Sequence, residues 1–125
     1  MKKILYLPLL FITCVCLAQD AKEIIGKPIK IDNILVAQND FPERMIWDDA
    51  KLACAKLGKG WSLPTKKELN TLYQNRDKIG GFARYNYWSF TEYDVKYKWA
   101  QSFVSGIQVY LNKYESFYVR AVKSL

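Results

Sequence analysis

The chain has 125 residues and a formal net charge of +7, which leaves room for one domain of basic character. It contains no histidine, which removes the commonest general base and metal ligand of enzymes. Half of its residues are hydrophobic and 15% are aromatic, a composition that can fill the core of a small domain.

The N-terminus has the pattern of a secretory signal peptide. Met1-Lys2-Lys3 is a short basic region, the stretch from Ile4 to Leu17 is largely apolar, and a polar pair follows Ala18. We therefore predict cleavage after Ala18, with residues 1–18 as the signal peptide and residues 19–125 as a single mature domain. The apolar stretch is too short for a stable membrane span, and no later run is apolar enough to be one.

A lipid anchor is the alternative for this N-terminus. Cys14 or Cys16 could carry the lipid, but neither follows the small residue that usually precedes a lipidated cysteine. Cleavage as a secretory signal is therefore favoured. We expect an exported protein that resides in the periplasm, on the outer surface or outside the cell.

The predicted mature chain stays basic after it loses Lys2 and Lys3. Lysine plus arginine falls from 19 to 17 against 12 acidic residues, which leaves 17 − 12 = +5. This charge favours anionic partners such as acidic glycans, surface polymers or nucleic acid. Solubility alone also explains it, because the basic residues form no dense cluster. No nucleic-acid-binding motif accompanies them, so we expect no nucleic-acid partner.

The first half of the mature chain is predicted to hold short strands and then a helix. Residues 19–27 are expected to be a loosely held lead-in, Pro28–Ala37 alternates partly and predicts one or two short strands, and Gln38–Glu43 is a polar loop. A helix is expected from Trp47 to about Leu57, because apolar residues recur there at helical spacing.

A second helix is predicted to begin after Thr65. Thr65 and Glu68 match a capping box, in which a hydroxyl and a carboxylate satisfy free amides reciprocally. Leu69 and Leu72 give the helix an apolar inward face. The ring of Pro64 forces the preceding residue to be extended, so the connection between the two helices is rigid.

From Phe82 onward the chain has β character. Four segments have the composition of strands: Tyr87–Phe90, Tyr97–Phe103, Ile107–Leu111 and Phe117–Val122. Short turns separate them, which predicts an antiparallel meander. Alternation in Ile107–Leu111 predicts one buried and one wetter face. Helices followed by antiparallel strands predict an α+β domain.

An ordered set of motifs resembles a known family. In chain order the motifs are Trp47-Asp-Asp-Ala, Cys54, Gly60-Trp-Ser-Leu-Pro-Thr-Lys-Lys-Glu-Leu69, Tyr87-Trp-Ser-Phe-Thr-Glu92, Trp99-Ala and Val119-Arg-Ala-Val122. They resemble the DUF1566 family, also described as the C-terminal domain of the Legionella collagen-like adhesin, from about Ile29 to Lys123. The resemblance implies a C-type-lectin-like fold, with two helices packed on small antiparallel sheets. It also implies a surface or secreted binding module, with adhesion and binding to glycosaminoglycan-like polymers as reported themes.

Two positions depart from the pattern of this family. Many relatives carry a cysteine where this chain has Ala121, placed to pair with the cysteine of the first helix, so Cys54 is expected to be a buried free thiol. The usual arginine after the motif tryptophan is Ser62 here, which puts in doubt any contact made by that arginine. The paired cysteines of the formylglycine-generating class, which is related in fold, are therefore absent.

Catalytic and metal chemistry have little support in the sequence. A thiol on the apolar face of a helix is inert, which excludes Cys54 as a nucleophile. Trp88 and Trp99 are not followed by the ligand sets of calcium-binding C-type lectins. Glu92 and Asp94 are the carboxylates that no helix end explains, and they alone motivate an enzyme. We expect no enzymatic activity, no cofactor and no metal.

Aromatic and basic residues in the second half of the chain are the remaining functional signal. Aromatic faces stack on sugar rings, and cations pair with sulfate or carboxylate groups. The candidate ligand-binding residues are Arg84, Tyr85, Tyr93, Lys96 and Lys98. Eight further residues are expected to be structural, in the core or in helix caps: Trp47, Cys54, Trp61, Pro64, Thr65, Glu68, Trp88 and Trp99.

These observations favour one function and leave another open. The favoured function is an exported, non-enzymatic recognition or adhesion domain that binds an anionic polysaccharide or a cell-surface partner. The alternative is a structural or assembly component of the cell envelope that binds another protein.

Overall fold

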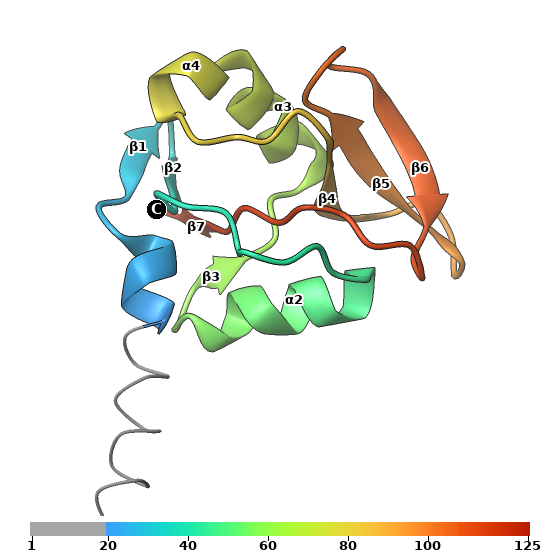
Figure 1. Ribbon diagram of the computed structural model, residues 1–125, viewed down its shortest axis with the longest axis horizontal. Coiled ribbons are helices and arrows are strands. Elements are labelled where there is room, and N and C mark those ends of the chain that lie inside the picture. The colour runs from blue at the N-terminus through green and yellow to red at the C-terminus, as the bar shows by residue number, and fades with distance from the viewer. Residues whose placement is uncertain (1–19) are drawn as a thin grey trace, which may run out of the picture.

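The computed structural model describes residues 20–125, so the predicted signal peptide, with Cys14 and Cys16, lies outside the described residues. Two antiparallel sheets and several helices make up the described chain (Figure 1). The helices are α2 (Trp47–Lys56), α3 (Lys66–Gln74) and α4 (Arg76–Ile79), and residues 20–25 are also helical. The strands are β1 (Ile29–Ile31), β2 (Ile34–Val36), β3 (Trp61–Ser62), β4 (Asn86–Glu92), β5 (Tyr97–Ser102), β6 (Gln108–Asn112) and β7 (Val122–Ser124). The predicted α+β class is confirmed.

The two sheets have different topologies. One has four strands in the order β1-β2-β7-β3, and the other is a three-stranded meander in the order β4-β5-β6. The last strand of the chain, β7, lies between β2 and β3, with Val36 opposite Val122. Figure 1 shows α2 below the sheets and α3 with α4 above them. The first and the last strand of the described chain therefore belong to one sheet.

The prediction of a four-strand meander is wrong in its last member. The segment Phe117–Val122 leaves the three-stranded sheet, to which only an isolated bridge at Tyr118 connects it, and the last strand begins at Val122. Val119 and Ala121 are fully buried, and their carbonyls accept hydrogen bonds from backbone amides of the loop after β2. This segment reads as a strand because its side chains are apolar, but it is a buried crossing between the two sheets.

Both predicted helices are present, and α3 has the predicted cap. The Thr65 hydroxyl accepts a hydrogen bond from the Glu68 amide at 3.1 Å, and the Glu68 carboxylate accepts one from the Thr65 amide at 2.9 Å. The loosely held lead-in is wrong, because residues 20–25 are helical and Ile24 is buried in the core. The amide of Gln38 fixes this segment by donating to the Ile25 carbonyl at 2.9 Å.

Two apolar clusters form the core, one on each side of β4. Trp88 points into the cluster under α2, which includes Trp47 and Cys54. Its neighbour Tyr87 points into the cluster under α3, which includes Leu69. Successive strand residues face opposite sides, so β4 contributes to both clusters. The three-stranded sheet is thus anchored through β4, which packs against α2 on one side and against α3 on the other.

Candidate functional site

Four aromatic side chains gather on the part of the three-stranded sheet that α3 does not cover. We call Tyr93, Tyr97, Trp99 and Tyr110 the aromatic face. Trp99 lies directly opposite Tyr110 in the β5–β6 register, so their rings share one side of the sheet. Tyr93 stacks on Tyr110 with ring centroids 3.9 Å apart and an angle of 5° between the rings. Trp99 meets Tyr110 edge to face at 5.5 Å.

The aromatic face is exposed rather than part of the core. The side chains of Tyr93 and Tyr110 are 52% and 46% exposed, and Trp99 is half-buried. The expectation that Trp99 fills the core is therefore wrong. It points to the side of β5 that carries Tyr97, while the opposite side carries the residues that face the helix α2.

A lysine from α3 lies against this face. The Lys66 ammonium is 3.4 Å from the centroid of the Trp99 ring, within the range of a cation–π interaction. The backbone of Lys66 is held at both ends, since its amide donates to Thr91 Oγ1 at 2.9 Å and its carbonyl accepts from Gln108 Nε2 at 2.7 Å. A positive charge thus lies over the half-buried Trp99 ring, which meets the exposed ring of Tyr110 edge to face.

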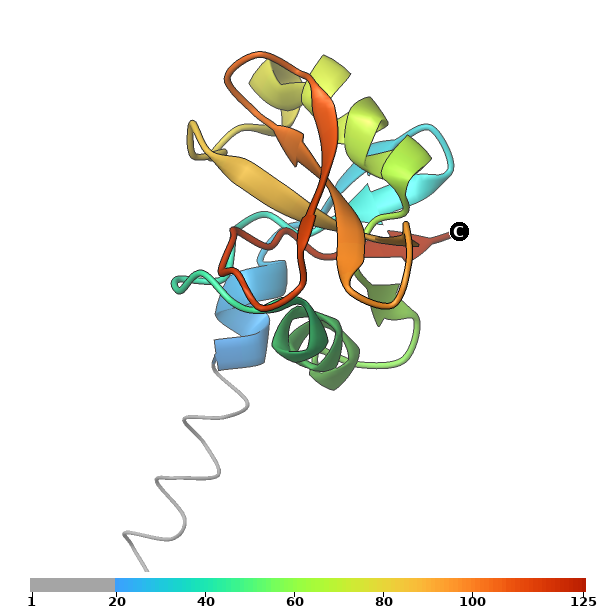
Figure 2. The ribbon, with the colours of Figure 1, turned by 90° about the vertical axis from the view of Figure 1, so that its right-hand side faces the viewer.

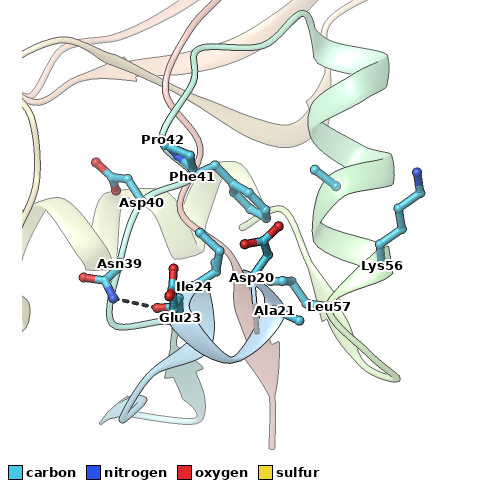
Figure 3. Close-up of a pocket in the computed structure, with 11 residues that line it drawn as sticks. Asp20, Ala21, Glu23, Ile24, Asn39, Asp40, Phe41, Pro42, Lys56 and Leu57 are labelled. Atoms are coloured by element: carbon cyan, nitrogen blue, oxygen red, sulfur yellow. Dashed lines mark hydrogen bonds between the residues drawn. The ribbon is translucent and has the colours of Figure 1, made fainter. Parts of the chain in front are cut away.

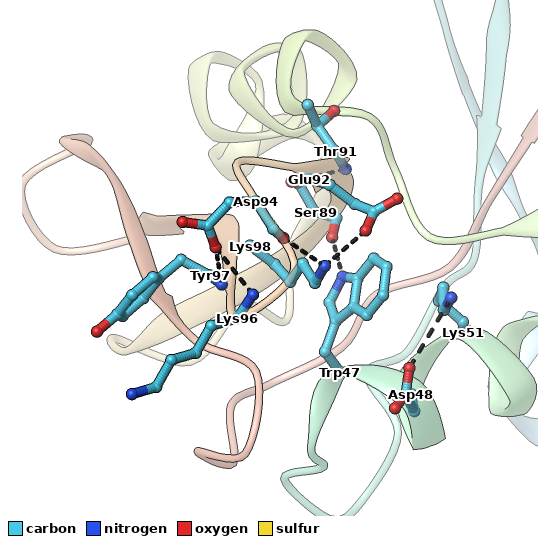
Figure 4. Close-up of polar contacts among 10 residues, drawn as sticks. All are labelled: Trp47, Asp48, Lys51, Ser89, Thr91, Glu92, Asp94, Lys96, Tyr97 and Lys98. Carbon is cyan, nitrogen blue, oxygen red and sulfur yellow. Dashed lines mark hydrogen bonds and ion pairs between the residues drawn. The ribbon is translucent and has the colours of Figure 1, made fainter.

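The turn between β4 and β5 carries Tyr93 and places Lys96 beside Tyr97, at the rim of the aromatic face (Figure 4). Asp94 accepts hydrogen bonds from the backbone amides of Lys96 and Tyr97 at 2.8 Å and 2.7 Å. The Lys96 ammonium lies 5.7 Å from the centroid of the Tyr97 ring and is free to reach a ligand. Asp94, one of the two carboxylates that motivate an enzyme in the sequence, serves here as the acceptor that shapes the turn.

Lys98 is not a contact residue, which corrects the sequence-based expectation. Its side chain is 2% exposed and its ammonium donates to Glu92 Oε1 at 2.5 Å and to the Asp94 carbonyl at 2.7 Å (Figure 4). The same ammonium lies 4.5 Å from the Trp47 ring. The hydrogen bond from Lys98 lowers the pKa of Glu92 below its ordinary value, and the charge of the lysine adds to this effect. The pair of Glu92 and Lys98 therefore stabilises the turn between β4 and β5.

Arg84 and Tyr85 lie at the other end of β4, away from Tyr93 and Lys96. Both are exposed, and the ring of Tyr85 stacks on Tyr118 at 5.5 Å with an angle of 15°. Because β4 is seven residues long and extended, its two ends are about 20 Å apart. The five residues expected to form one contact surface are thus divided between two surfaces and the interior.

The remaining residues expected to be structural lie in the core or in the caps. Trp47 donates through its indole nitrogen to the Ser89 carbonyl, and Trp88 donates to the Met45 carbonyl. Trp61 and Pro64 are buried as well. Cys54 is buried and free, and burial raises the pKa of its thiol to about 12, which rules out a reactive thiolate at neutral pH.

A buried polar network behind the sheets was missed from the sequence. The Arg120 side chain is fully buried and its Nε donates to Asp40 Oδ1 at 2.7 Å. The Tyr87 hydroxyl donates to the other oxygen of Asp40 and accepts from the Ala83 amide. Burial raises the pKa of Asp40, although the nearby guanidinium opposes that shift. The signal for this network is an arginine between apolar residues in Val119-Arg-Ala-Val122, which requires a buried acid.

A pocket of about 720 Å³ opens between the N-terminal helix, the loop after β2 and α2 (Figure 3). Ile24, Phe41 and Leu57 give it an apolar lining, and Asp20 and Lys56 add charge. The predicted binding residues are not among those that line it. Within residues 20–125 no cluster of histidine, cysteine or acidic side chains could hold a metal ion. Among the described helices, none is long and apolar enough to cross a membrane.

The fold and these surfaces define a small α+β domain with antiparallel sheets, of a kind that suggests a binding module. The chain belongs to the family of the Lcl C-terminal domain, whose model matches residues 20–123. This membership is consistent with the resemblance to the C-terminal domain of the Legionella collagen-like adhesin. No curated protein sequence matches the chain.

Solved structures show the same fold at low sequence identity. A chain in the complex of a von Willebrand factor mutant A1 domain with botrocetin is 12% identical, with a TM-score of 0.57 over 80% of this chain and 98% of that chain. Botrocetin itself is 13% identical, with a TM-score of 0.58 over the same shares. Both likenesses are consistent with the expected C-type-lectin-like fold.

Proposed function

We propose that this chain is an exported, non-enzymatic recognition domain that binds an anionic polysaccharide through its aromatic face. Membership of the Lcl C-terminal domain family and the likeness to botrocetin support a binding module. One observation carries the choice of surface and ligand. The Lys66 ammonium lies 3.4 Å above the Trp99 ring, beside the exposed Tyr93–Tyr110 pair.

This arrangement suits a sugar ring that carries an acidic group. The C–H groups of a pyranose pack on an aromatic face, while sulfate or carboxylate oxygens accept charge-assisted hydrogen bonds from an ammonium. The Tyr93–Tyr110 pair offers the apolar surface and Lys66 the cation, and Lys96 at the rim adds a second charge. The absence of a calcium ligand set on this face favours binding that is independent of calcium.

Two lysines at neighbouring positions allow a sharp test. Lys66 touches Trp99 whereas Lys67, the next residue of α3, is exposed, so Lys66→Gln and Lys67→Gln remove the same charge from different places. The full chain should bind a heparin-derivatised matrix at low salt and elute as salt screens the charges. Lys66→Gln should elute at lower salt than Lys67→Gln. Passage of the unmodified protein without retention, or equal loss in the two variants, would sink the proposal.

The aromatic contribution has its own matched pair. Tyr93 and Tyr85 are similarly exposed, at 52% and 60%, but lie at opposite ends of β4. Tyr93→Ala should weaken retention and Tyr85→Ala should leave it unchanged. Unfolding curves of both variants check that neither loses its fold.

An envelope component that binds another protein is the second candidate. The exposed Tyr85, which stacks on the half-buried Tyr118, and the exposed Arg84 beside it favour that interpretation. A pull-down from cell envelopes would distinguish the two. A protein partner that is lost with Tyr85→Ala and kept with Tyr93→Ala supports the second candidate.

A further inference from the structure

Strand β6 is an open edge of the three-stranded sheet. β5 occupies one of its sides, and along the other no strand of residues 20–125 pairs with it (Figures 1 and 2). The opposite edge of the sheet is closed, because the β4 residue Trp88 donates its amide to the Tyr118 carbonyl at 3.1 Å. The sheet therefore has one free edge.

The backbone groups at this edge are available for pairing. The Ser102 amide donates to the Ile107 carbonyl at 3.0 Å, which fixes the phase of the β5–β6 ladder. Hydrogen-bonded positions alternate along a strand. The backbone amides and carbonyls of Val109 and Leu111 therefore point toward β5, and those of Tyr110 point away from it. Within residues 20–125, no backbone hydrogen bond from outside the β5–β6 ladder reaches either of these two groups.

This edge lacks the features that usually prevent edge pairing. Proteins protect free edges with lysine, proline, bulges or inward-pointing charges. The sequence Gln108-Val-Tyr-Leu-Asn112 has no charge and no proline, and its register with β5 is regular over all five residues. The pairing of β4 with β5, in contrast, shifts between Trp88 and Glu92.

The inward side of β6 is also incompletely buried. Val109 and Leu111 are half-buried, whereas Lys98 and Ala100, which lie opposite them on β5, are 2% and 1% exposed. The expected buried face of this strand is therefore only partly formed, and Ile107 at its start is 61% exposed. Another strand beside β6 would complete this burial.

We propose that two copies of this chain pair through β6 as antiparallel strands, about a two-fold axis at Tyr110. In this register Tyr110 faces Tyr110 of the second copy, Val109 faces Leu111, and Gln108 faces Asn112. Apolar residues meet apolar residues, amides meet amides, and no like charges oppose each other. The interface is self-complementary, as a two-fold dimer requires. The occupant is thus a second copy, because the strand matches itself.

The pairing has a consequence for the aromatic face. A two-fold axis perpendicular to the joined sheet places equivalent side chains of both copies on the same side. The two aromatic faces would then form one surface, on which a repeating polymer contacts both copies at once. The pairing itself does not depend on the proposed function.

Sedimentation equilibrium of the protein made from the full chain tests the pairing. The protein should show a reversible monomer–dimer equilibrium. Tyr110→Lys places two like charges directly opposite each other and should weaken the association by at least about tenfold. Tyr114→Lys is the matched control, since Tyr114 is 67% exposed and lies beyond the strand, and it should associate like the unmodified protein. Circular dichroism confirms that both variants are folded.

A cysteine tests the register independently of the charge variants. Opposite Cα atoms of a hydrogen-bonded antiparallel pair are about 5.5 Å apart, within the range of a disulfide. Air-oxidised Tyr110→Cys should therefore form a covalent dimer, and Tyr114→Cys should not, while buried Cys54 stays reduced.

Three results would overturn the proposal: a monomer at every concentration, a Tyr110→Lys variant that associates as strongly as the unmodified protein, or a Tyr110→Cys variant that does not crosslink. None of these measurements involves polysaccharide, so failure of the pairing is distinguishable from failure of the proposed function.

Discussion

Arg120 and Asp40 form an ion pair across 80 residues of sequence, with Arg120 Nε 2.7 Å from Asp40 Oδ1 and the arginine side chain fully buried. The guanidinium also donates to the carbonyls of Ala37 and Gly80, both at 3.2 Å. One side chain thus joins the loop after β2, the turn after α4 and the crossing segment before β7. The guanidinium charge is buried away from water, so these partners must compensate for the lost hydration.

Removal of the acid should therefore be costly. Asp40→Asn leaves the buried guanidinium of Arg120 without a counter-charge, and we expect a loss of about 3–5 kcal/mol in the free energy of unfolding. Urea unfolding at neutral pH measures this change. The control is Asp48→Asn, which breaks an exposed pair with Lys51 at 3.9 Å and should cost at most about 1 kcal/mol. Equal losses in the two variants would show that the buried pair has no special role.

The Glu92–Lys98 pair predicts a pH dependence of stability. The folded-state pKa of Glu92 is lowered from its ordinary value of 4.5, first by the hydrogen bond from Lys98 and then by the charge of that lysine. A lowered pKa means that the unfolded chain binds the proton more readily. The contribution is therefore fully present above pH 4.5 and is lost as the pH falls through the lower folded-state pKa.

A charge-neutral variant isolates this contribution. Glu92→Gln should be less stable than the unmodified protein at neutral pH, and the difference should shrink as the solution is acidified below pH 4.5. Parallel urea unfolding series over the acidic range provide the measurement. A difference that stays constant with pH would contradict the role of the ionised carboxylate.

The helix cap at Thr65 supports both stability and the candidate site. Thr65→Ala removes the acceptor for the Glu68 amide and should cost about 1 kcal/mol in the free energy of unfolding. It should also weaken retention on the heparin-derivatised matrix, because Lys66 follows the cap directly. Thr71→Ala makes the same chemical change within α3, where Thr71 Oγ1 bonds only the Lys67 carbonyl at 3.3 Å, and it should leave both properties nearly unchanged.

The sequence predicts the local elements well and the faces of the strands poorly. The capping box and the apolar spacing of α2 depend on residues a few positions apart, so they can be recognised without the fold. The orientation of β5 cannot, because an alternating strand has two possible inward faces. Tyr97 and Trp99 suggest the inward face by their apolar character. In the structure Tyr97 and Trp99 are on the outer face of β5. Lys98 takes the inner face, where its ammonium donates to Glu92 and to the Asp94 carbonyl and lies near the Trp47 ring.

Contacts between residues far apart in the sequence are the second feature that could not be predicted. The contact of Asp40 with Arg120 joins residues that are 80 positions apart in the chain, and no local spacing indicates it. The segment Phe117–Val122 has the apolar composition of a strand. A buried segment that crosses between two sheets needs the same composition, so the sequence does not distinguish a strand from a crossing. The strand order β1-β2-β7-β3 decides between them. It places the last strand in the sheet of the first, so the segment before it must cross from one sheet to the other.

The thiol of Cys54 tests both the core and the predicted cleavage after Ala18. Burial raises the pKa of this thiol to about 12, so the folded protein should not react with a thiol reagent such as DTNB at neutral pH. In denaturant, the exported protein should react as one thiol per chain, because cleavage removes Cys14 and Cys16 with residues 1–18. A count of three, the number of cysteines in the full sequence, would mean that residues 1–18 are retained. Cys54→Ala should abolish the remaining reaction, and intact mass separates a cleaved chain from a lipidated one. Rapid reaction in the folded state would contradict the burial of Cys54 on the inner side of α2.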